Sequence, residues 1–336
     1  MNNVLLYGLG SFGFSLLKHL KDKCAGQCKL WAFDRSPETM EALRQGLPHP
    51  YVKKGFLENG DVIFPQSLDE IKEPIDIIIL AVTAKAVPEV FTNCLHSLGH
   101  RPFILVNTAK ALAPDGSLTS KYLSNLSPPG SFSYVYFAGG TIAEDLFNGH
   151  PLGATIASKD PQALAVIDNL LSSPFLRLYS SNDVAGVEYC AAFKNVIAIF
   201  AGLIKGLGWP YGSETYFISR FAEEVERLTV NKLGGSSESF TISSQHWGND
   251  LWMSCTGPTR NREFGERVGR GEAPDKALEA MKKEKKSVEG LATIEVLPLL
   301  VKELESYPFL LATYMIIMEG AEPSTTIHEL IETKKV

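Results

Sequence analysis

Near its N-terminus the chain reads Val4-Leu5-Leu6-Tyr7-Gly8-Leu9-Gly10-Ser11-Phe12-Gly13, and this stretch decides the fold. Its apolar start predicts a buried strand, and the Gly-x-Gly-x-x-Gly that follows is typical of a turn that opens a helix and binds a dinucleotide. Gly8 permits the tight turn, Gly10 lets the backbone approach a pyrophosphate, and Gly13 lets the helix pack on the strand. The N-terminus of that helix, at Ser11 and Phe12, offers unpaired N–H groups to the phosphates.

An acidic residue follows the second expected strand. Asp34 lies 21 residues beyond Gly13, directly after the apolar run 30–33. A carboxylate at this position accepts hydrogen bonds from a ribose diol, which favours NAD. Arg35 beside it could instead accept a 2′-phosphate, so both NAD and NADP stay open as the cofactor.

Short apolar runs recur through the first half of the chain. They lie at 4–7, 30–33, 77–82, 103–106 and 134–137, with two further candidates at 154–158 and 175–179. The runs are apolar throughout rather than alternating, which indicates strands that are covered on both faces. Segments such as 14–23 and 37–45 between them have the pattern of helices. The sequence therefore predicts an α/β fold that begins with a Rossmann-type, doubly wound sheet.

The second half of the chain has a different character. Strand signals fade after Ser180-Ser181-Asn182-Asp183, a cluster that suits the start of a helix. Helices are predicted at 184–207, 213–233, 236–247, 260–271, 273–283, 288–305 and 309–319. We therefore expect a dinucleotide-binding domain over 1–181 and an all-α, substrate-binding domain over 182–336.

The composition excludes several classes of protein. The 336 residues are 45% hydrophobic and 21% charged, as in an average globular protein, and the net charge is −6. An acidic balance argues against a nucleic-acid partner or a membrane surface, because both favour a basic excess. Two charged stretches are expected to be solvated: the helix face with Glu223, Glu224 and Glu226, and the helix end at 282–286.

The N-terminus and the cysteines bear on the compartment. The chain starts without the basic region of a signal peptide, and no run approaches the ~20 apolar residues that cross a bilayer, so we expect a cytoplasmic protein without membrane insertion. Five cysteines are few and odd in number, which predicts reduced thiols. A metal held by Cys24 and Cys28 is the weaker alternative, and we expect no metal site.

Lys194 is the only charged residue in the apolar segment 189–204. On a helix its neighbours three and four residues away are all small or apolar, where an unpaired ammonium is costly, although a long stem can carry it out to water. We expect Lys194 to face a cleft between the domains. Desolvation there lowers its pKa and suits it to exchange a proton with a carbonyl or hydroxyl oxygen. Asn195 beside it can hydrogen-bond a polar substrate.

A second polar group lies in the segment 248–262. Asp250 stands among apolar residues, and Ser254, four residues on, would share its helical face. Arg260 and Asn261 follow Pro258, at the expected start of another helix. A guanidinium, an amide and a helix N-terminus together suit a phosphate group. The alternative is an ordinary turn with a surface arginine.

Several of these motifs, in this order, resemble those of the NAD(P)-dependent glycerol-3-phosphate dehydrogenases over nearly the whole chain. The matching stretches are Gly186-Val187-Glu188, Lys194-Asn195-Val196-Ile197-Ala198, Gly206-Leu207-Gly208, Ser254-Cys255-Thr256 and Arg260-Asn261-Arg262, with Gly139, Ala143-Glu144 and Glu289-Gly290 also in place. The resemblance implies an oxidoreductase that interconverts dihydroxyacetone phosphate and sn-glycerol 3-phosphate with NADH or NADPH, for glycerophospholipid synthesis. It is also compatible with a homodimer.

The resemblance implies roles for individual residues. The catalytic group comprises Lys194 as general acid and base, Lys110 as a second active-site lysine, and Asp250 as the carboxylate that orients and tunes them. The substrate would be bound by Lys110, Asn195, Ser254, Arg260 and Asn261, the last two at its phosphate. The cofactor would be bound by Phe33, Lys110, Ala143, Arg260 and Glu289, together with Gly8, Gly10, Ser11, Phe12, Gly13 and Asp34.

Some stretches depart from the usual pattern of the family, which leaves one alternative open, and a second alternative comes from another class of protein. The family usually has a Ser-Gly-Pro-like run where this chain has Ala138-Gly139-Gly140, and Lys-Gly where it has Lys110-Ala111. The run after Gly208, Trp209-Pro210-Tyr211, also differs from the one that the family favours. A divergent member could act on a different small phosphorylated or carboxylated hydroxy compound. A nucleotide-sensing binding protein without catalysis is the other alternative, but a pure sensor needs neither the two lysines nor Asp250.

Overall fold

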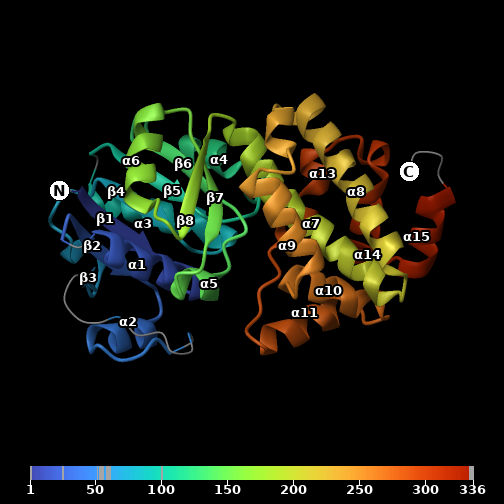
Figure 1. The fold of residues 1–336 in the computed structure, drawn as a ribbon, viewed down its shortest axis with the longest axis horizontal. Coiled ribbons are helices and arrows are strands. Elements are labelled where there is room, and N and C mark those ends of the chain that lie inside the picture. Colours follow the sequence, from blue (N-terminus) through green and yellow to red (C-terminus); the bar gives the residue numbers. More distant parts are fainter. Residues whose placement is uncertain are drawn as a thin grey trace. The chain divides into compact units, whose positions relative to one another are not determined.

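The computed structural model describes residues 2–24, 26–50, 52, 57, 62–99 and 101–332. These residues form two compact units, each with its own core (Figure 1). The first unit comprises Met1–Ala109 and Ser120–Val184, and the second comprises Lys110–Thr119 and Ala185–Val336. The short segment that begins at Lys110 is thus part of the helical unit, although it follows a strand of the first unit in the sequence.

The first unit is built on one sheet. Within the described residues the sheet has eight strands in the order β3-β2-β1-β4-β5-β6-β7-β8, and all neighbours are parallel except β6 and β7. The order reverses between β1 and β4, the point at which doubly wound sheets bind their ligands. The predicted Rossmann-type fold is confirmed. The strands are β1 (Asn2–Tyr7), β2 (Cys28–Phe33), β3 (Val62–Ile63), β4 (Ile77–Leu80), β5 (Phe103–Asn107), β6 (Phe132–Ala138), β7 (Leu152–Ala157) and β8 (Leu176–Ser181).

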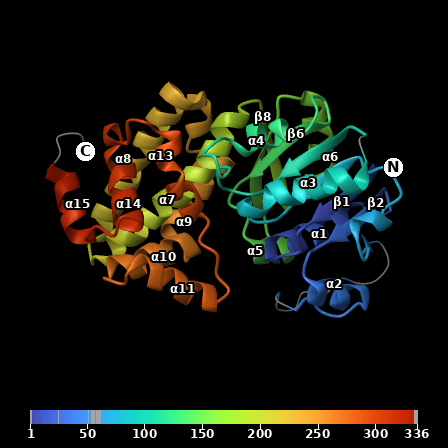
Figure 2. The same cartoon turned by 180° about the vertical axis from the view of Figure 1, so that it is seen from behind.

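Helices cover both faces of this sheet (Figures 1 and 2). Side chains such as Leu6 and Ile79 point into the layer that holds α1 (Ser11–Cys24), α2 (Pro37–Arg44), α5 (Ala143–Phe147) and α6 (Pro161–Leu171). Leu5 and Ile78 point into the other layer, with α3 (Val87–Leu98), α4 (Thr119–Asn125) and the short turns η1 (Leu68–Glu70) and η2 (Ala84–Ala86). Burial on both faces explains why the strands are apolar at every position.

The regular elements in the described part of the second unit are all helices. Its longer helices are α7 (Val184–Gly206), α8 (Tyr211–Leu228), α10 (Arg260–Gly269), α11 (Pro274–Lys283), α14 (Pro308–Met318) and α15 (Pro323–Glu332). Its shorter ones are α9 (Asp250–Thr256), α12 (Gly290–Glu295), α13 (Leu297–Leu300), η3 (Thr229–Leu233), η4 (Ser237–Phe240), η5 (Gln245–Asn249) and η6 (Leu304–Ser306). The predicted helices at 184–207, 260–271, 273–283 and 309–319 are confirmed to within about two residues, the usual uncertainty of helix ends.

Two predicted helices are wrong as single elements. The segment 236–247 forms η4 and η5 instead, because serine side chains replace helical bonding: Ser236 Oγ accepts from Glu238 N and Ser244 Oγ accepts from Gly248 N, both at 3.2 Å. The segment 288–305 is divided into α12, α13 and η6. Pro298 lacks the N–H that a continuous helix would need.

Helix α7 forms the centre of the second unit. Its side chains from Tyr189 to Ile204, apart from Gly202, are all among the buried residues. By length and composition α7 could cross a membrane, contrary to the expectation that no run approaches that size, but its apolar window is wholly buried inside the unit. Glycines bring α10 against it, since a Cβ at Gly202 would lie 2.1 Å from Arg262 O and one at Gly265 would lie 1.9 Å from Ile199 O. This close approach fixes the polar residues of α7 and α10 relative to each other.

Glu224 contradicts the prediction of a solvated acidic face. It is 5% exposed and lies on the buried side of α8 with Phe217 and Phe221. Its carboxylate accepts from Phe309 N at 3.2 Å and from Leu310 N at 2.9 Å, so it caps the start of α14. Burial raises the pKa of Glu224 to about 7, and the two N–H groups offset this only in part.

Stability should therefore fall as the pH rises from 4.5 to about 7, because folded Glu224 keeps a proton that the unfolded carboxyl has lost. The expected loss is about 3 kcal/mol in the free energy of unfolding. Glu224→Gln, measured by urea unfolding at several pH values, should lack this component of the slope. The control Glu223→Gln changes an exposed neighbour and should keep it. Equal slopes for wild type and Glu224→Gln would contradict the assignment.

The cysteines correct another expectation. Cys24 at the end of α1 and Cys28 at the start of β2 form a disulfide, with their Cα atoms 5.7 Å apart. The prediction that all thiols are reduced is wrong for this pair, because the tight turn brings the two Cα atoms within disulfide range. Cys94, Cys190 and Cys255 are buried thiols. Burial raises the pKa of Cys94 and of Cys255 to about 12, which leaves them without thiolate character.

Candidate active site

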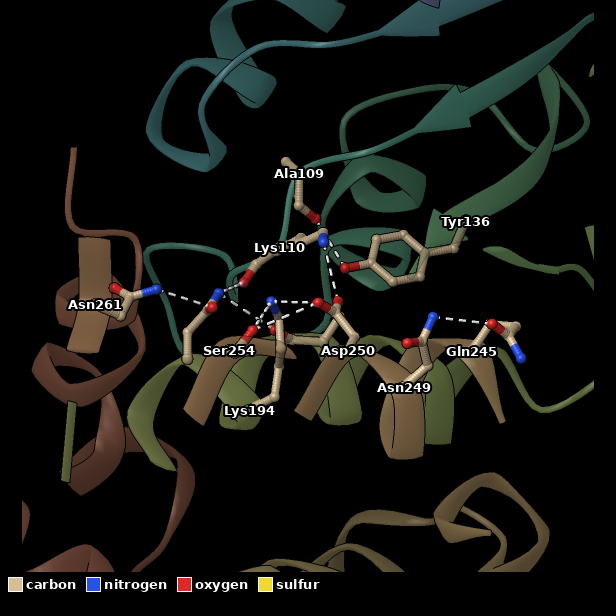
Figure 3. Close-up of polar contacts among 11 residues, drawn as sticks. Ala109, Lys110, Tyr136, Lys194, Gln245, Asn249, Asp250, Ser254 and Asn261 are labelled. Atoms are coloured by element: carbon tan, nitrogen blue, oxygen red, sulfur yellow. Dashed lines mark hydrogen bonds and ion pairs between the residues drawn. The ribbon is translucent and has the colours of Figure 1, made fainter. Parts of the chain in front are cut away.

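Lys194 is buried in the second unit, with 4% of its surface exposed. Its Nζ donates to Asp250 Oδ1 and to Ser254 Oγ, each at 2.8 Å (Figure 3). Asp250 and Ser254 lie one turn apart on α9, on the shared face that the sequence predicts. The lysine stem does not carry its charge out to water. The ammonium is instead held by an ion pair inside the protein.

Asp250 also binds the second lysine. Lys110 Nζ donates to Asp250 Oδ2 at 2.9 Å, so a carboxylate with no exposed surface lies between two ammonium groups. The Lys110 carbonyl accepts a longer hydrogen bond, 3.4 Å, from Asn195 Nδ2. Because the segment that begins at Lys110 belongs to the second unit, both lysines and the carboxylate are assembled within that one unit.

The charges of this cluster do not cancel. Burial lowers the pKa of Lys194, and the positive Lys110 lowers it further, while the carboxylate of Asp250 opposes both. Burial would raise the pKa of Asp250, but the two ammonium groups together hold it below its usual value. With both lysines protonated, the ion-paired trio of Lys110, Lys194 and Asp250 carries one positive charge in excess. The cluster is therefore prepared to stabilise negative charge on a bound molecule.

Two asparagines join the neighbouring helices. Asn261 Nδ2 donates to Asn195 Oδ1 at 2.9 Å, and Asn261 Oδ1 accepts from Gly290 N at 3.0 Å. This chain of contacts links α7, α10 and the start of α12. Glu289, the residue before Gly290, is half-buried, and its charge acts on Lys194. The structure thus brings these predicted site residues together around the lysine.

Arg260 lies differently from its neighbour Asn261. It is the first residue of α10, it is exposed, and it donates to Ser287 Oγ at 3.2 Å. The predicted helix start is confirmed, so the guanidinium stands beside a positive helix N-terminus. Sequence reasoning missed the contact with Ser287, which no motif marks.

The remaining predicted residues lie in the first unit, at the turn after β1. Gly8 has a φ of +102°, and a Cβ at Gly13 would lie 1.9 Å from Gly8 O, so both positions require glycine. A Cβ at Gly10 would meet no atom within 4 Å, which leaves open space where a pyrophosphate could approach the backbone. Ser11 and Phe12 begin α1. These features fit a bound dinucleotide.

Other predicted cofactor contacts surround the same edge of the sheet. Phe33 ends β2, and its carbonyl accepts from Gly8 N at 2.8 Å. Asp34 follows it, and its Oδ2 accepts from Leu9 N at 2.6 Å. Ala143 is the first residue of α5, which packs against α1. Sequence reasoning missed His49, which also contacts this turn, because it lies in a connection outside the glycine-rich run.

Comparison with family models assigns the two halves of the chain. Residues 3–164 match the N-terminal domain, and residues 183–328 the C-terminal domain, of NAD-dependent glycerol-3-phosphate dehydrogenase. A relative named NAD(P)+ glycerol-3-phosphate dehydrogenase from Deinococcus radiodurans is 33% identical over 291 residues, which is 86% of this chain and 83% of that protein. The protein of the same name from Myxococcus xanthus is 30% identical over 96% of this chain and 95% of its own.

Solved structures show the same fold. The crystal structure of glycerol-3-phosphate dehydrogenase from Coxiella burnetii superposes with a TM-score of 0.84 and 23% identity, over 98% of this chain and 99% of that one. The enzyme of that name from Plasmodium falciparum superposes with a TM-score of 0.85 and 17% identity, over 100% and 96%. At these identities the structures support the fold, while the sequence matches carry the family.

Proposed function

Since the chain belongs to the NAD-dependent glycerol-3-phosphate dehydrogenase family, we propose that it interconverts dihydroxyacetone phosphate and sn-glycerol 3-phosphate with NADH or NADPH. The observation that carries this proposal is the buried Lys110–Asp250–Lys194 cluster, whose excess positive charge suits an oxyanion. A binding protein that only senses a nucleotide would gain nothing from two ammonium groups held on one buried carboxylate.

Lys194 acts as the general acid in the direction of ketone reduction. The reduced nicotinamide, when bound, supplies a hydride to C2 of the ketone. Negative charge then grows on the carbonyl oxygen, and the Lys194 ammonium stabilises and protonates it. Asp250 and Ser254 hold the ammonium in place, so little reorganisation is needed as the proton moves. In the reverse direction the neutral amine takes the proton from the hydroxyl group.

The other residues bind and orient the substrate. Lys110 adds positive potential beside the reacting oxygen, and Asn195 and Ser254 offer polar groups to the substrate. Arg260 and Asn261, at the start of α10, hold its phosphate, because a guanidinium and a helix N-terminus both favour an anion. Anchoring the phosphate keeps C2 positioned for reaction.

The cofactor is held by the first unit. Gly8, Gly10, Ser11, Phe12 and Gly13 cradle the pyrophosphate, as the open position at Gly10 supports. The contacts predicted for Phe33, Asp34, Lys110, Ala143, Arg260 and Glu289 are part of the same proposal. Residues 1–181 thus serve as the dinucleotide-binding domain and 182–336 as the substrate-binding domain, with the segment from Lys110 working with the latter.

The same proposal covers the setting of the reaction. The protein works in the cytoplasm as a homodimer, without a nucleic-acid partner or membrane insertion, and supplies the backbone of glycerophospholipids. The alternative is a related reaction on a different phosphorylated or carboxylated hydroxy compound, which the departures at Lys110-Ala111 and Trp209-Pro210-Tyr211 favour.

Initial rates of dihydroxyacetone phosphate reduction with NADH and with NADPH test the proposal. We expect turnover with both and a higher kcat/KM with NADH, because the Asp34 carboxylate would repel a 2′-phosphate. A panel of phosphorylated and carboxylated ketones, assayed in parallel, serves as the comparison. Binding of NADH without reduction of dihydroxyacetone phosphate would contradict the proposal, and a faster analogue would favour the alternative.

A further inference from the structure

Side chains hold the peptide groups of Leu9, at the centre of the glycine-rich turn, from both sides. Asp34 Oδ2 accepts from Leu9 N at 2.6 Å, and His49 Nε2 lies 2.6 Å from Leu9 O. A carbonyl oxygen can only accept, so Nε2 carries the proton and donates it. Leu9 is 1% exposed and His49 is buried, so the bond between His49 and Leu9 O lies out of competition with water.

His49 is itself fixed. Its Nδ1 accepts from Val52 N at 3.1 Å, its ring packs 4.7 Å from the ring of Phe14, and it is 4% exposed. Because Nδ1 accepts a hydrogen bond, the ring is neutral. Burial lowers the pKa of His49, against the opposing effects of its bond to Leu9 and the charge of Asp34. One nitrogen donates and the other accepts, which commits both to protein partners.

The two contacts tie the turn to separate parts of the fold. Asp34 Oδ1 also accepts from Ser36 N at 2.8 Å, so Asp34 links Leu9 to the start of α2. His49 links Leu9 to the connection after α2. Glycines flank Leu9 on both sides, and glycine has more backbone freedom than any other residue. A turn of this composition needs such restraints to keep one conformation.

We propose that His49 is a positioning residue for the dinucleotide, which fixes the Leu9 peptide and so preorganises the glycine-rich turn and the start of α1 for the pyrophosphate. The inference rests on the proposed function, in that the ligand of the turn is NADH. His49 acts through Leu9, because its ring nitrogens are engaged by Leu9 and Val52. The glycines leave space for the phosphates, and His49 holds the Leu9 peptide in the conformation that keeps this space open.

Direct titration of NADH by fluorescence tests this role in three variants of the full chain. His49→Ala should raise the Kd for NADH roughly tenfold, the loss of about one hydrogen bond. The kcat at saturating NADH and the KM for dihydroxyacetone phosphate should stay within about twofold, because the substrate residues lie in the other unit. His49→Gln restores a donor near Leu9 O and should restore the affinity. His49→Asn restores only an acceptor for Val52 N and should not.

His19→Ala is the matched control. His19 Nε2 lies 2.7 Å from Leu171 O, so this variant loses the same kind of bond in the same unit without touching the turn. It should lower the thermal midpoint and leave the Kd for NADH unchanged. If His49→Ala does not fold, the NADH affinities of His49→Gln and His49→Asn are compared instead, and a higher affinity in His49→Gln supports the role of His49.

Three results would overturn the inference: wild-type affinity in His49→Ala, equal affinity in His49→Gln and His49→Asn, or a loss in His19→Ala as large as in His49→Ala. Wild-type protein that binds no NADH would contradict the proposed function as well. Normal binding by wild type, together with any of the three results, would contradict the role of His49 alone.

Discussion

Replacing Lys194 by methionine should lower kcat for the reduction of dihydroxyacetone phosphate by roughly a thousandfold, the usual contribution of a general acid and oxyanion partner. Methionine keeps a similar unbranched shape in the buried site but has no proton to give. Asp250 keeps one partner in Lys110, so the fold should survive. Steady-state oxidation of NADH at saturating ketone measures the effect.

Lys205→Met is the matched control for this variant. Lys205 lies on the same helix but is largely exposed, where it pairs with Glu266 at 2.8 Å. Its replacement should leave kcat within about twofold of wild type, since exposed ion pairs contribute little. A Lys194→Met enzyme that is as active as the Lys205→Met enzyme would show that the buried amine is not the proton donor.

Replacing Asp250 by asparagine should damage both stability and activity. The change keeps the shape of the side chain but leaves two buried ammonium groups without their carboxylate, at an expected cost of about 3–5 kcal/mol in the free energy of unfolding. Lys194 would then lose the partner that opposes the fall of its pKa. With less ammonium at neutral pH, we expect kcat to fall by roughly a hundredfold and to recover in part as the pH is lowered.

The pH profile separates this role from a merely structural one. Glu214→Gln is a suitable control, because Glu214 is a buried carboxylate of the same unit that accepts from Arg262 at 2.6 Å and does not contact the lysines. Glu214→Gln should lose stability and keep the pH profile of the wild type. An Asp250→Asn enzyme with an unshifted profile would contradict the proposed tuning of Lys194.

The sequence predicts much of the first unit because its signals are local. The parallel strands are apolar on both faces. In the glycine-rich turn, a φ of +102° requires glycine at position 8, and a close approach of the backbone requires glycine at position 13. β3 was not predicted, since Val62–Ile63 is too short to form a pattern. The disulfide of Cys24 and Cys28 depends on the geometry of a turn, which composition does not express.

Among the buried ionisable residues of the second unit, the sequence indicates a site residue where a single charge lies in an apolar segment. Lys194 and Asp250 stand out because each is an isolated charge in an apolar segment. Glu224 is equally buried but lies among other acidic residues, so its place seven residues after Phe217 on the core side of α8 was overlooked. Lys110 was assigned by resemblance alone, because no local pattern shows that its segment joins the helical unit. His49 depends on a contact 40 residues away in the chain.

In the proposed mechanism the Lys194 ammonium neutralises the alkoxide as it forms. A single turnover of the NADH complex with saturating dihydroxyacetone phosphate, followed by stopped flow, measures this step apart from product release. We expect Lys194→Met to bind NADH normally but to oxidise it roughly a thousandfold more slowly than wild type. Single-turnover rates for the two proteins that agree within about threefold would contradict it.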